Sequence, residues 1–216
     1  MRSNGGIIGA KKTVSTSAAS GIWAIRDAQR ETGANNWPVS GDFHSIATTT
    51  VGSGGTGSIT FSSIPSTYKH LQIRFISQTN RSTADNADDV YIRFNSDSTD
   101  NYISHRLRGI PSSTESVAIP TGSGFTAILL PTAAGVTANA NSYGASIIDI
   151  LDYANSNKYK TLKTLCGIDA NASPSFITLA SGFWRNTSAI TSITLVPGVG
   201  NTFSQYSHFA LYGIKG

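Results

Sequence analysis

Carboxylates gather in two neighbouring segments of this sequence and are the first candidates for chemistry. With the amides beside them, they are Asp85, Asp88, Asp89, Asn95, Asp97, Asp100 and Asn101. Carboxylate and amide oxygens are the ligands that a hard cation such as calcium takes in proteins. The spacing does not match an EF-hand loop, and acidic loops are usually only solvated. We therefore expect no metal site, with cation binding by residues 85–101 as the open alternative.

Asp149 and Asp152 suggest glycoside hydrolysis, which needs two carboxyl groups on either side of one bond. A spacing of three along a strand sends the two side chains to opposite faces of the sheet, so they cannot flank a bond. The histidines also lack the spacing of metal ligands; they are His44, His70, His105 and His208. The sequence therefore predicts no catalytic residues and a protein that is not an enzyme.

Two further patterns have plain structural explanations. Gly52, Gly54 and Gly57 match a dinucleotide-binding fingerprint in spacing, but they follow a Thr run and lead into a strand pattern, not a helix. We expect no cofactor there. Cys166 is the single cysteine and lies between apolar neighbours, which is typical of a buried core thiol and excludes an internal disulfide.

Charge is concentrated at the N-terminus. Residues 1–37 hold five of the 16 Lys and Arg residues and two of the 12 Asp and Glu residues. Nucleic-acid binding needs basic side chains and stacking aromatics along one face, and Lys158, Lys160 and Lys163 beside Tyr159 come nearest to it. We interpret them as lysines on a solvated edge strand and expect no nucleic-acid partner. A membrane span or secretory signal is not apparent either, so we expect no membrane partner.

Strand patterns recur from residue 58 to the C-terminus. Apolar residues alternate with polar ones over 71–75 and 90–95, which is typical of strands with one buried face. The segment 145–153 is apolar on both faces, so it is either central or covered by a second subunit. Further strands are predicted over 102–107, 116–119, 125–130, 161–169, 176–181, 190–196 and 208–214. The predicted fold class is mainly β, an antiparallel β-sandwich or jelly roll preceded by an extended N-terminal arm with one short helix.

The N-terminal arm is predicted to span residues 1–47. Ser20 can cap a helix over about residues 21–32, and Gly33 is its expected stop. This segment is too small to bury its two tryptophans alone, so we expect it to dock on another surface. The side chains expected to dock are Ile7, Ile8, Lys11, Lys12, Ile22, Trp23, Ile25, Arg26, Arg30 and Trp37. A flexible linker is predicted over residues 48–57, before a β-sandwich domain over residues 58–216.

Several segments resemble proteins of tailed phages. The opening GGIIGAKKTVSTSAASGIWAIRDAQRETGANNWP is similar to the N-terminal segment of many virion structural proteins, those of cyanophages especially. The segments SIPSTYKHLQIRF, FNSDSTDNYISHRLRG, AITSITL and SHFALYGIKG resemble the β-rich body of fibre-like and decoration-like virion proteins. The resemblance covers nearly the whole chain. It implies an oligomeric β module, commonly a homotrimer, fixed to the particle through its N-terminal segment, and it carries over no catalytic residues.

The expected function is therefore that of a structural protein of the virion, made in the cytoplasm of the host bacterium. We favour a tail fibre-type appendage whose Ser, Thr and Asn-rich loops contact host surface glycan. Other virion proteins and further copies of the chain are the expected partners. Two alternatives stay open: a capsid decoration or head fibre protein, and a carbohydrate-binding module with Tyr68, Tyr102 or Tyr143 as its aromatic platform.

Overall fold

The computed structural model describes residues 13–15, 18–20, 24–34, 42–82, 87–120, 124–135, 141–169, 175–198 and 200–216. Contacts divide the chain into two units, Met1–Gly41 and Asp42–Gly216. In the first unit, β1 (Thr13–Ser15) pairs antiparallel with β2 (Ala18–Ser20), and α1 (Ile25–Gly33) follows. Among the described residues, no helix has the length and hydropathy needed to cross a bilayer.

The predicted helix is confirmed at its end and wrong at its start. Ser20 does not cap it, because Ser20 is paired with Thr13 in the β1–β2 ladder. The first turn instead forms at Ala24, whose carbonyl accepts hydrogen bonds from the backbone N–H groups of Asp27 at 2.9 Å and Ala28 at 3.0 Å. The helix ends at Gly33, where the sequence predicts its stop.

The second unit confirms that the protein is mainly β. Its strands are β3 (Phe43–Thr50), β4 (Ile59–Phe61), β5 (His70–Thr79), β6 (Ala87–Phe94), β7 (Tyr102–Ile110), β8 (Ser113–Ile119), β9 (Ile128–Gly135), β10 (Gly144–Leu151), β11 (Lys160–Ile168), β12 (Phe176–Trp184), β13 (Ile193–Pro197) and β14 (His208–Ile214). They form one hydrogen-bonded path that is antiparallel except at the short parallel contact of β5 with β9. The alternating patterns therefore predict most of these strands to within a few residues.

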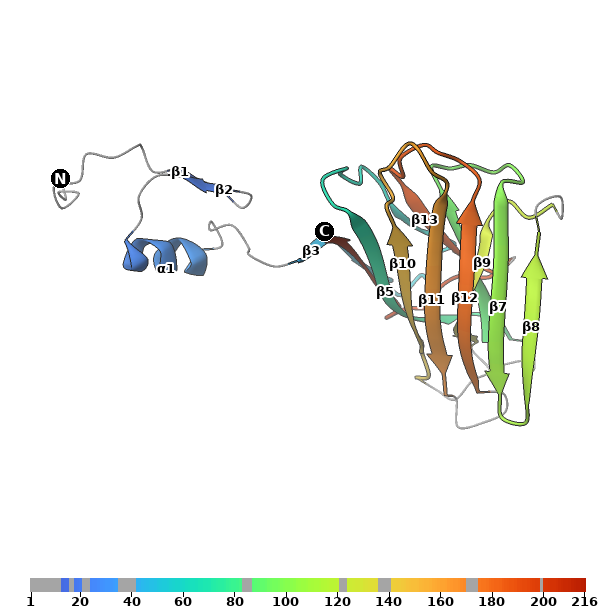
Figure 1. The fold of residues 1–216 in the computed structure, drawn as a ribbon. Helices are drawn as coiled ribbons and strands as arrows, with labels where there is room; N and C mark the ends of the chain where they lie inside the picture. Colours follow the sequence, from blue (N-terminus) through green and yellow to red (C-terminus); the bar gives the residue numbers. More distant parts are fainter. Residues whose placement is uncertain are drawn as a thin grey trace. The chain divides into compact units, whose positions relative to one another are not determined.

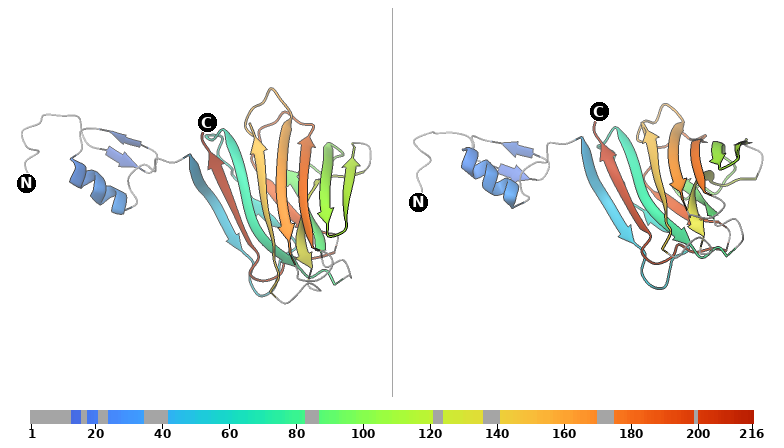
Figure 2. Two further views of the ribbon diagram at one scale, coloured as in Figure 1. Left: turned by 60° about the horizontal axis from the view of Figure 1, so that its bottom comes forward. Right: turned by 90° about the horizontal axis from the view of Figure 1, so that it is seen from below.

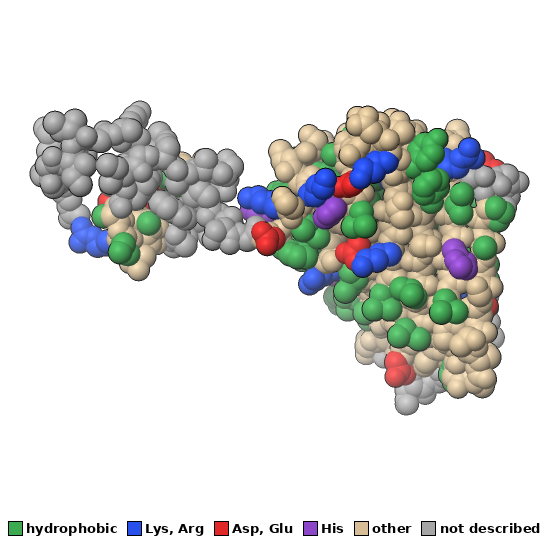
Figure 3. Space-filling view, in the orientation of Figure 1, with side chains coloured by type: hydrophobic (Ala, Val, Ile, Leu, Met, Phe, Trp, Pro, Cys, Tyr) green, Lys and Arg blue, Asp and Glu red, His purple; other side chains and the backbone are tan. Residues whose placement is uncertain are grey.

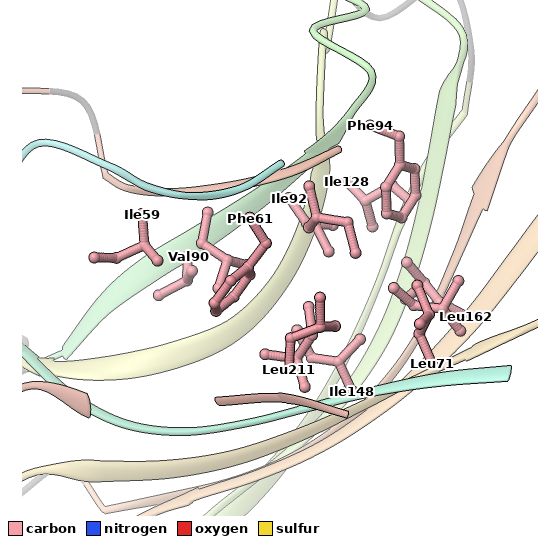
Figure 4. Close-up of a cluster of buried hydrophobic side chains, with 14 of the residues drawn as sticks. Ile59, Phe61, Leu71, Val90, Ile92, Phe94, Ile128, Ile148, Leu162 and Leu211 are labelled. Carbon is pink, nitrogen blue, oxygen red and sulfur yellow. The ribbon is translucent and has the colours of Figure 1, made fainter. Parts of the chain in front are cut away.

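The strands lie in two layers. The larger layer has the order β3, β14, β5, β10, β11, β12, β7, β8, and the smaller layer has the order β4, β13, β6, β9. Figures 1 and 2 show the larger layer curving across the smaller one. Buried side chains from both layers meet between them, for example Ile92 and Phe94 of β6 with Leu71 of β5 and Ile148 of β10 (Figure 4).

The linker expected over residues 48–57 is not a flexible connector. Thr48, Thr49 and Thr50 belong to β3, where they pair with β14. Val51 follows, is 5% exposed, and donates its backbone N–H to Ser207 O at 2.8 Å. The β-branched threonines suit a strand, and their backbone is satisfied by β14, so the second unit begins at Asp42 and not at residue 58.

The segment that is apolar on both faces is β10, a central strand between β5 and β11. Ile148 and Ile150 point into the core and are fully buried. Ile147 and Leu151 point to the opposite, outer face and stay well exposed. The central position accounts for the inner residues, and the outer ones stay exposed among the residues that the structure describes.

Candidate interaction surface

The structure describes three of the residues predicted to dock. Ile25, Arg26 and Arg30 lie on α1, and the Ile25 side chain is 80% exposed. Arg30 is held along the helix by Glu31 at 3.1 Å and Asp27 at 3.9 Å. The remaining predicted residues lie outside the described parts of the chain; they are Ile7, Ile8, Lys11, Lys12, Ile22, Trp23 and Trp37.

The outer face of the larger layer carries a second and more extensive apolar surface. One row of four side chains, here called the apolar row, consists of Ile147, Leu165, Leu179 and Leu107. The register of three ladders brings them side by side, because Leu165 is paired with Ile147 on one flank and Leu179 on the other. Leu179 is in turn paired with Leu107. Each is between 39% and 54% exposed.

A shallow hollow adjoins the apolar row. Ala145 and Gly167 are paired neighbours that form its floor. Ile76 and Ile177 stand on either side of them in the same row of residues. With Ile147 and Leu165 of the apolar row, these residues line a cavity of about 1010 Å³. The floor is low because alanine and glycine have almost no side chain, so the hollow is a direct result of residue size.

A polar band crosses the same face beside the apolar row. Gln72 donates to Asp149 Oδ1 at 2.7 Å and accepts a bond from Arg74 at 2.6 Å. Lys163 Nζ lies 3.6 Å from Asp149 Oδ2. In Figure 3 apolar side chains gather over the lower half of this face, and charged side chains lie above them. The apolar row is therefore bordered on one side by a band of polar and charged side chains.

Asp97, one of the predicted cation-loop carboxylates, has a structural role. Its carboxylate accepts hydrogen bonds from Thr99, from Asn101 at 3.2 Å, and from the buried indole of Trp184 at 2.7 Å. Burial by itself would raise the pKa of Asp97, but the bonds from Thr99, Trp184 and Asn101 outweigh it and lower the pKa to about 2. The carboxylate thus holds the loop against the core.

The other acidic segment is also occupied by protein partners. Asp88 is buried and accepts bonds from Arg81 at 3.3 Å and Asn201 at 2.9 Å. Asp89 lies 3.1 Å from Arg106 and 3.4 Å from Arg108. Across the described residues, no group of three or more His, Cys, Asp and Glu side chains is arranged to hold a metal ion.

Asp149 and Asp152 occupy different surroundings. Asp149 belongs to the polar band, whereas Asp152 lies in the turn after β10 and binds Lys158 and Lys69, the latter at 2.9 Å. These hydrogen bonds lower the pKa of Asp152 to about 2. His70 accepts the backbone N–H of Asp152 at 3.0 Å.

Of the lysines expected on a solvated edge strand, Lys158 and Lys163 are exposed, but the strand is not at an edge and Lys160 is buried. β11 is a central strand, and Lys160 points into the core, where the residue is 1% exposed. Its ammonium donates to the carbonyls of Asn155 at 2.6 Å, Lys158 at 2.9 Å and Thr187 at 2.9 Å. A buried lysine is tolerated here because three backbone oxygens satisfy it. Cys166 is buried on the same strand, as expected of a core thiol.

The aromatic platform predicted for sugar binding is not available at Tyr102, which is 1% exposed and donates its hydroxyl to Asp97 O at 2.9 Å. Tyr143 is partly buried and donates to Gln205 O at 2.8 Å. Tyr159, which stands edge-on to Phe183 at 5.4 Å, is the more open ring. The sequence does not single out this pair, because Tyr159 precedes β11 whereas Phe183 belongs to β12, and only the fold brings them together.

Comparison with known proteins adds little to this geometry. No protein-family model matches the chain, and no curated protein matches it. Among solved structures, a protein of unknown function from Shewanella oneidensis MR-1 is similar at 9% identity and a TM-score of 0.20, over 81% of this chain and 76% of that one.

Proposed function

We propose that this protein is a structural component of a tailed phage virion, a β-sandwich or jelly-roll module fixed to the particle through its N-terminal segment. The observation that carries the proposal is the division of the chain into the unit Met1–Gly41 and a β unit with a large core of its own. Together with the phage-like sequence segments, this division supports a displayed module and a separate attachment segment. We favour a tail fibre-type appendage.

The attachment segment has the properties of a docking element. α1 has nine residues, and a helix this short is marginal in water without a packing surface. Ile25 is largely exposed, with Arg26 exposed beside it. Burial of Ile25, Trp23 and Trp37 in a particle protein would each contribute about 1.5–3 kcal/mol before ordering costs. Attachment through more than one copy of the chain would multiply this binding by avidity, by roughly 100-fold or more.

Deletion of residues 1–41 tests the attachment. The cut precedes Asp42, whose carbonyl accepts the backbone N–H of Lys215 at 3.0 Å, so it spares β3 and its pairing with β14. The truncated protein should fold, and phage particles assembled with it should lack it. A full-length variant with Thr60→Asp, on the exposed side of β4, serves as the control and should be incorporated normally. Incorporation of the truncated protein at the full-length level would refute the attachment.

A capsid decoration or head fibre protein would be attached in the same way. A particle reconstruction separates the two positions, because density repeated with the symmetry of the shell belongs to the head and density repeated around the tail axis belongs to the tail. We expect the tail.

Contact with host surface glycan is proposed at a polar hollow between the end of β5 and the start of β6. It has a volume of about 420 Å³, and among its lining residues are Asn80, Arg81, Asp89, Tyr91 and Asn201. A ring beside several hydrogen-bonding groups is a suitable site for a small polar ligand such as a sugar. Glycan-array binding should be lost in Tyr91→Leu and kept in Tyr159→Leu. Equal binding by both variants would contradict this site, and glycan binding by a chain that never joins particles would favour a free carbohydrate-binding module.

A further inference from the structure

We propose that the outer face of the larger layer packs face to face on the same face of a second copy of this chain. The twofold axis runs parallel to the strands, between β11 and β12. This pairing is independent of the virion function proposed above, because it rests on the face of the β unit alone.

The position of the axis follows from the apolar row. The row crosses β10, β11, β12 and β7, so its centre lies between β11 and β12. Rotation about that line places Leu165 of one copy opposite Leu179 of the other. It also places Ile147 opposite Leu107. Aligned sheets keep their strands within about 30° of each other at a spacing of about 10 Å, so the centre of the row stays in contact.

The next row of residues is complementary under the same rotation. Ile177, 61% exposed, is the most prominent apolar side chain of the face, and it comes to lie opposite Gly167. An added Cβ at Gly167 would meet nothing nearer than Phe176 O at 3.9 Å, so the space above this glycine is open. Each copy therefore offers one projecting isoleucine and one hollow that receives it. Self-complementarity of this kind is what a twofold interface requires.

The polar band agrees with this axis and excludes a neighbouring one. With the axis between β11 and β12, Lys163 lies opposite Ser181, and Asp149 lies opposite His105. An axis over β11 itself would place Lys163 opposite the same lysine of the second copy, which is repulsive. The charges thus exclude an axis over β11 and are compatible with the line that the apolar row gives.

The size of the face is sufficient for a stable pair. From β5 to β8 the strands cover about 25 Å in each direction, which is on the order of 600 Å² before side-chain relief is added. Stable interfaces bury about 600–1,000 Å² on each partner, so the face reaches the lower end of that range. A trimer, implied by the resemblance, would bring different surfaces together at each contact and would not match Ile177 with Gly167 in both directions.

Sedimentation velocity of the purified full-length chain tests the pairing. Wild type should sediment at twice the monomer mass. Leu179→Asp should weaken association by about 100-fold or more, because it buries a carboxylate against leucine. Thr60→Asp adds the same charge to the smaller layer and should leave association unchanged. Far-UV circular dichroism confirms that each variant is folded.

A size exchange tests the axis itself. Gly167→Val and Ile177→Gly should each weaken association by about tenfold or more, the first by a clash and the second by loss of the projecting side chain. The double variant should recover most of the affinity, because the large and the small residue have changed places. The glycine introduced by Ile177→Gly can also destabilise its own strand. The melting temperature of each variant is therefore measured, so that a loss of stability is distinguished from a loss of association.

Each outcome decides the proposal. A monomer or a trimer in the wild-type sample would overturn it, and so would a dimer that survives Leu179→Asp. Failure of the double variant to exceed both single variants would overturn the placement of the axis. Because particles are not needed for these measurements, a monomeric result leaves the proposed attachment through residues 1–41 unaffected.

Discussion

The two faces of the larger layer come from alternate residues of the same strands, and they differ in what covers them. On β10, Ile148 is fully buried against the smaller layer, while the adjacent Ile147 is 39% exposed on the outer face. On β11, Lys160 is buried and Lys163 is exposed. Both faces are rich in large aliphatic residues, so apolar content alone does not separate a core from a surface.

This difference separates the side chains that stabilise the fold from those whose apolar area stays available for association. Side chains between the layers lose their contact with water when this chain folds, and they stabilise the monomer. The apolar row keeps about half of its surface in water, so much of its apolar area is still free to be buried on association. Residues on the two faces therefore give matched pairs of substitutions. The substitution on the buried face is predicted to lower the free energy of unfolding, and its counterpart on the outer face is predicted to change it little.

The largest expected effect is at the buried member of such a pair. Ile148→Ala should lower the free energy of unfolding by about 3 kcal/mol, because it removes a fully buried aliphatic side chain and leaves a cavity. Ile147→Ala should lower it by about 1 kcal/mol or less. Urea unfolding at a protein concentration below the onset of association measures both. Equal losses would show that the outer face is also part of the core.

The second effect concerns the two lysines of β11. Lys160→Met should cost about 2 kcal/mol of unfolding free energy, because the carbonyls of Asn155, Lys158 and Thr187 lose their shared donor. Lys163→Met, on the exposed end of a surface ion pair, should cost about 0.5 kcal/mol or less. Thermal or urea unfolding of the two variants side by side gives the comparison. A larger loss for the exposed lysine would contradict the inward orientation of Lys160.

Lys160 also shows the limit of sequence patterns. A lysine in a sequence is usually taken to face solvent. The carbonyls that accept hydrogen bonds from Lys160 lie in two loops, at residues 155–158 and at Thr187, and the second loop is distant in sequence. The polar strand β3 was missed for a related reason. Its threonines look like a linker in the sequence. They form a strand because β14, at the far end of the chain, supplies their hydrogen-bond partners.

Patterns within one strand were more informative. Alternation in β5 and β6 predicts both the strands and their buried faces, because a period of two fixes which side chains share a face. The apolar row could not be assembled in the same way. Leu107, Ile147, Leu165 and Leu179 become neighbours only through the register of three separate ladders.

The third effect is acid destabilisation through Asp97, which lies in the loop between β6 and β7 and accepts a hydrogen bond from the buried indole of Trp184. The folded-state pKa is about 2, below the ordinary value of 3.8, so the stabilisation is fully present above pH 4 and is lost as the pH falls towards 2. After allowance for screening by solvent, this amounts to about 1 kcal/mol. Asp97→Asn keeps an acceptor for Trp184 and should flatten that part of the stability curve between pH 4 and 2. An unchanged slope in the variant would show that Asp97 does not titrate in this range.

The smallest expected effect is on the outer face at Ile177. Ile177→Thr keeps a β-branched side chain on an exposed strand position, so the free energy of unfolding should change by about 0.5 kcal/mol or less. Ile150→Thr, in the core at the same depth as Ile148, places an unbonded hydroxyl among apolar side chains and should cost about 2 kcal/mol or more. Chemical unfolding of dilute protein measures both. If Ile177→Thr proved as costly as Ile150→Thr, folding alone would account for an isoleucine at this position, and a second copy would not be needed to explain it.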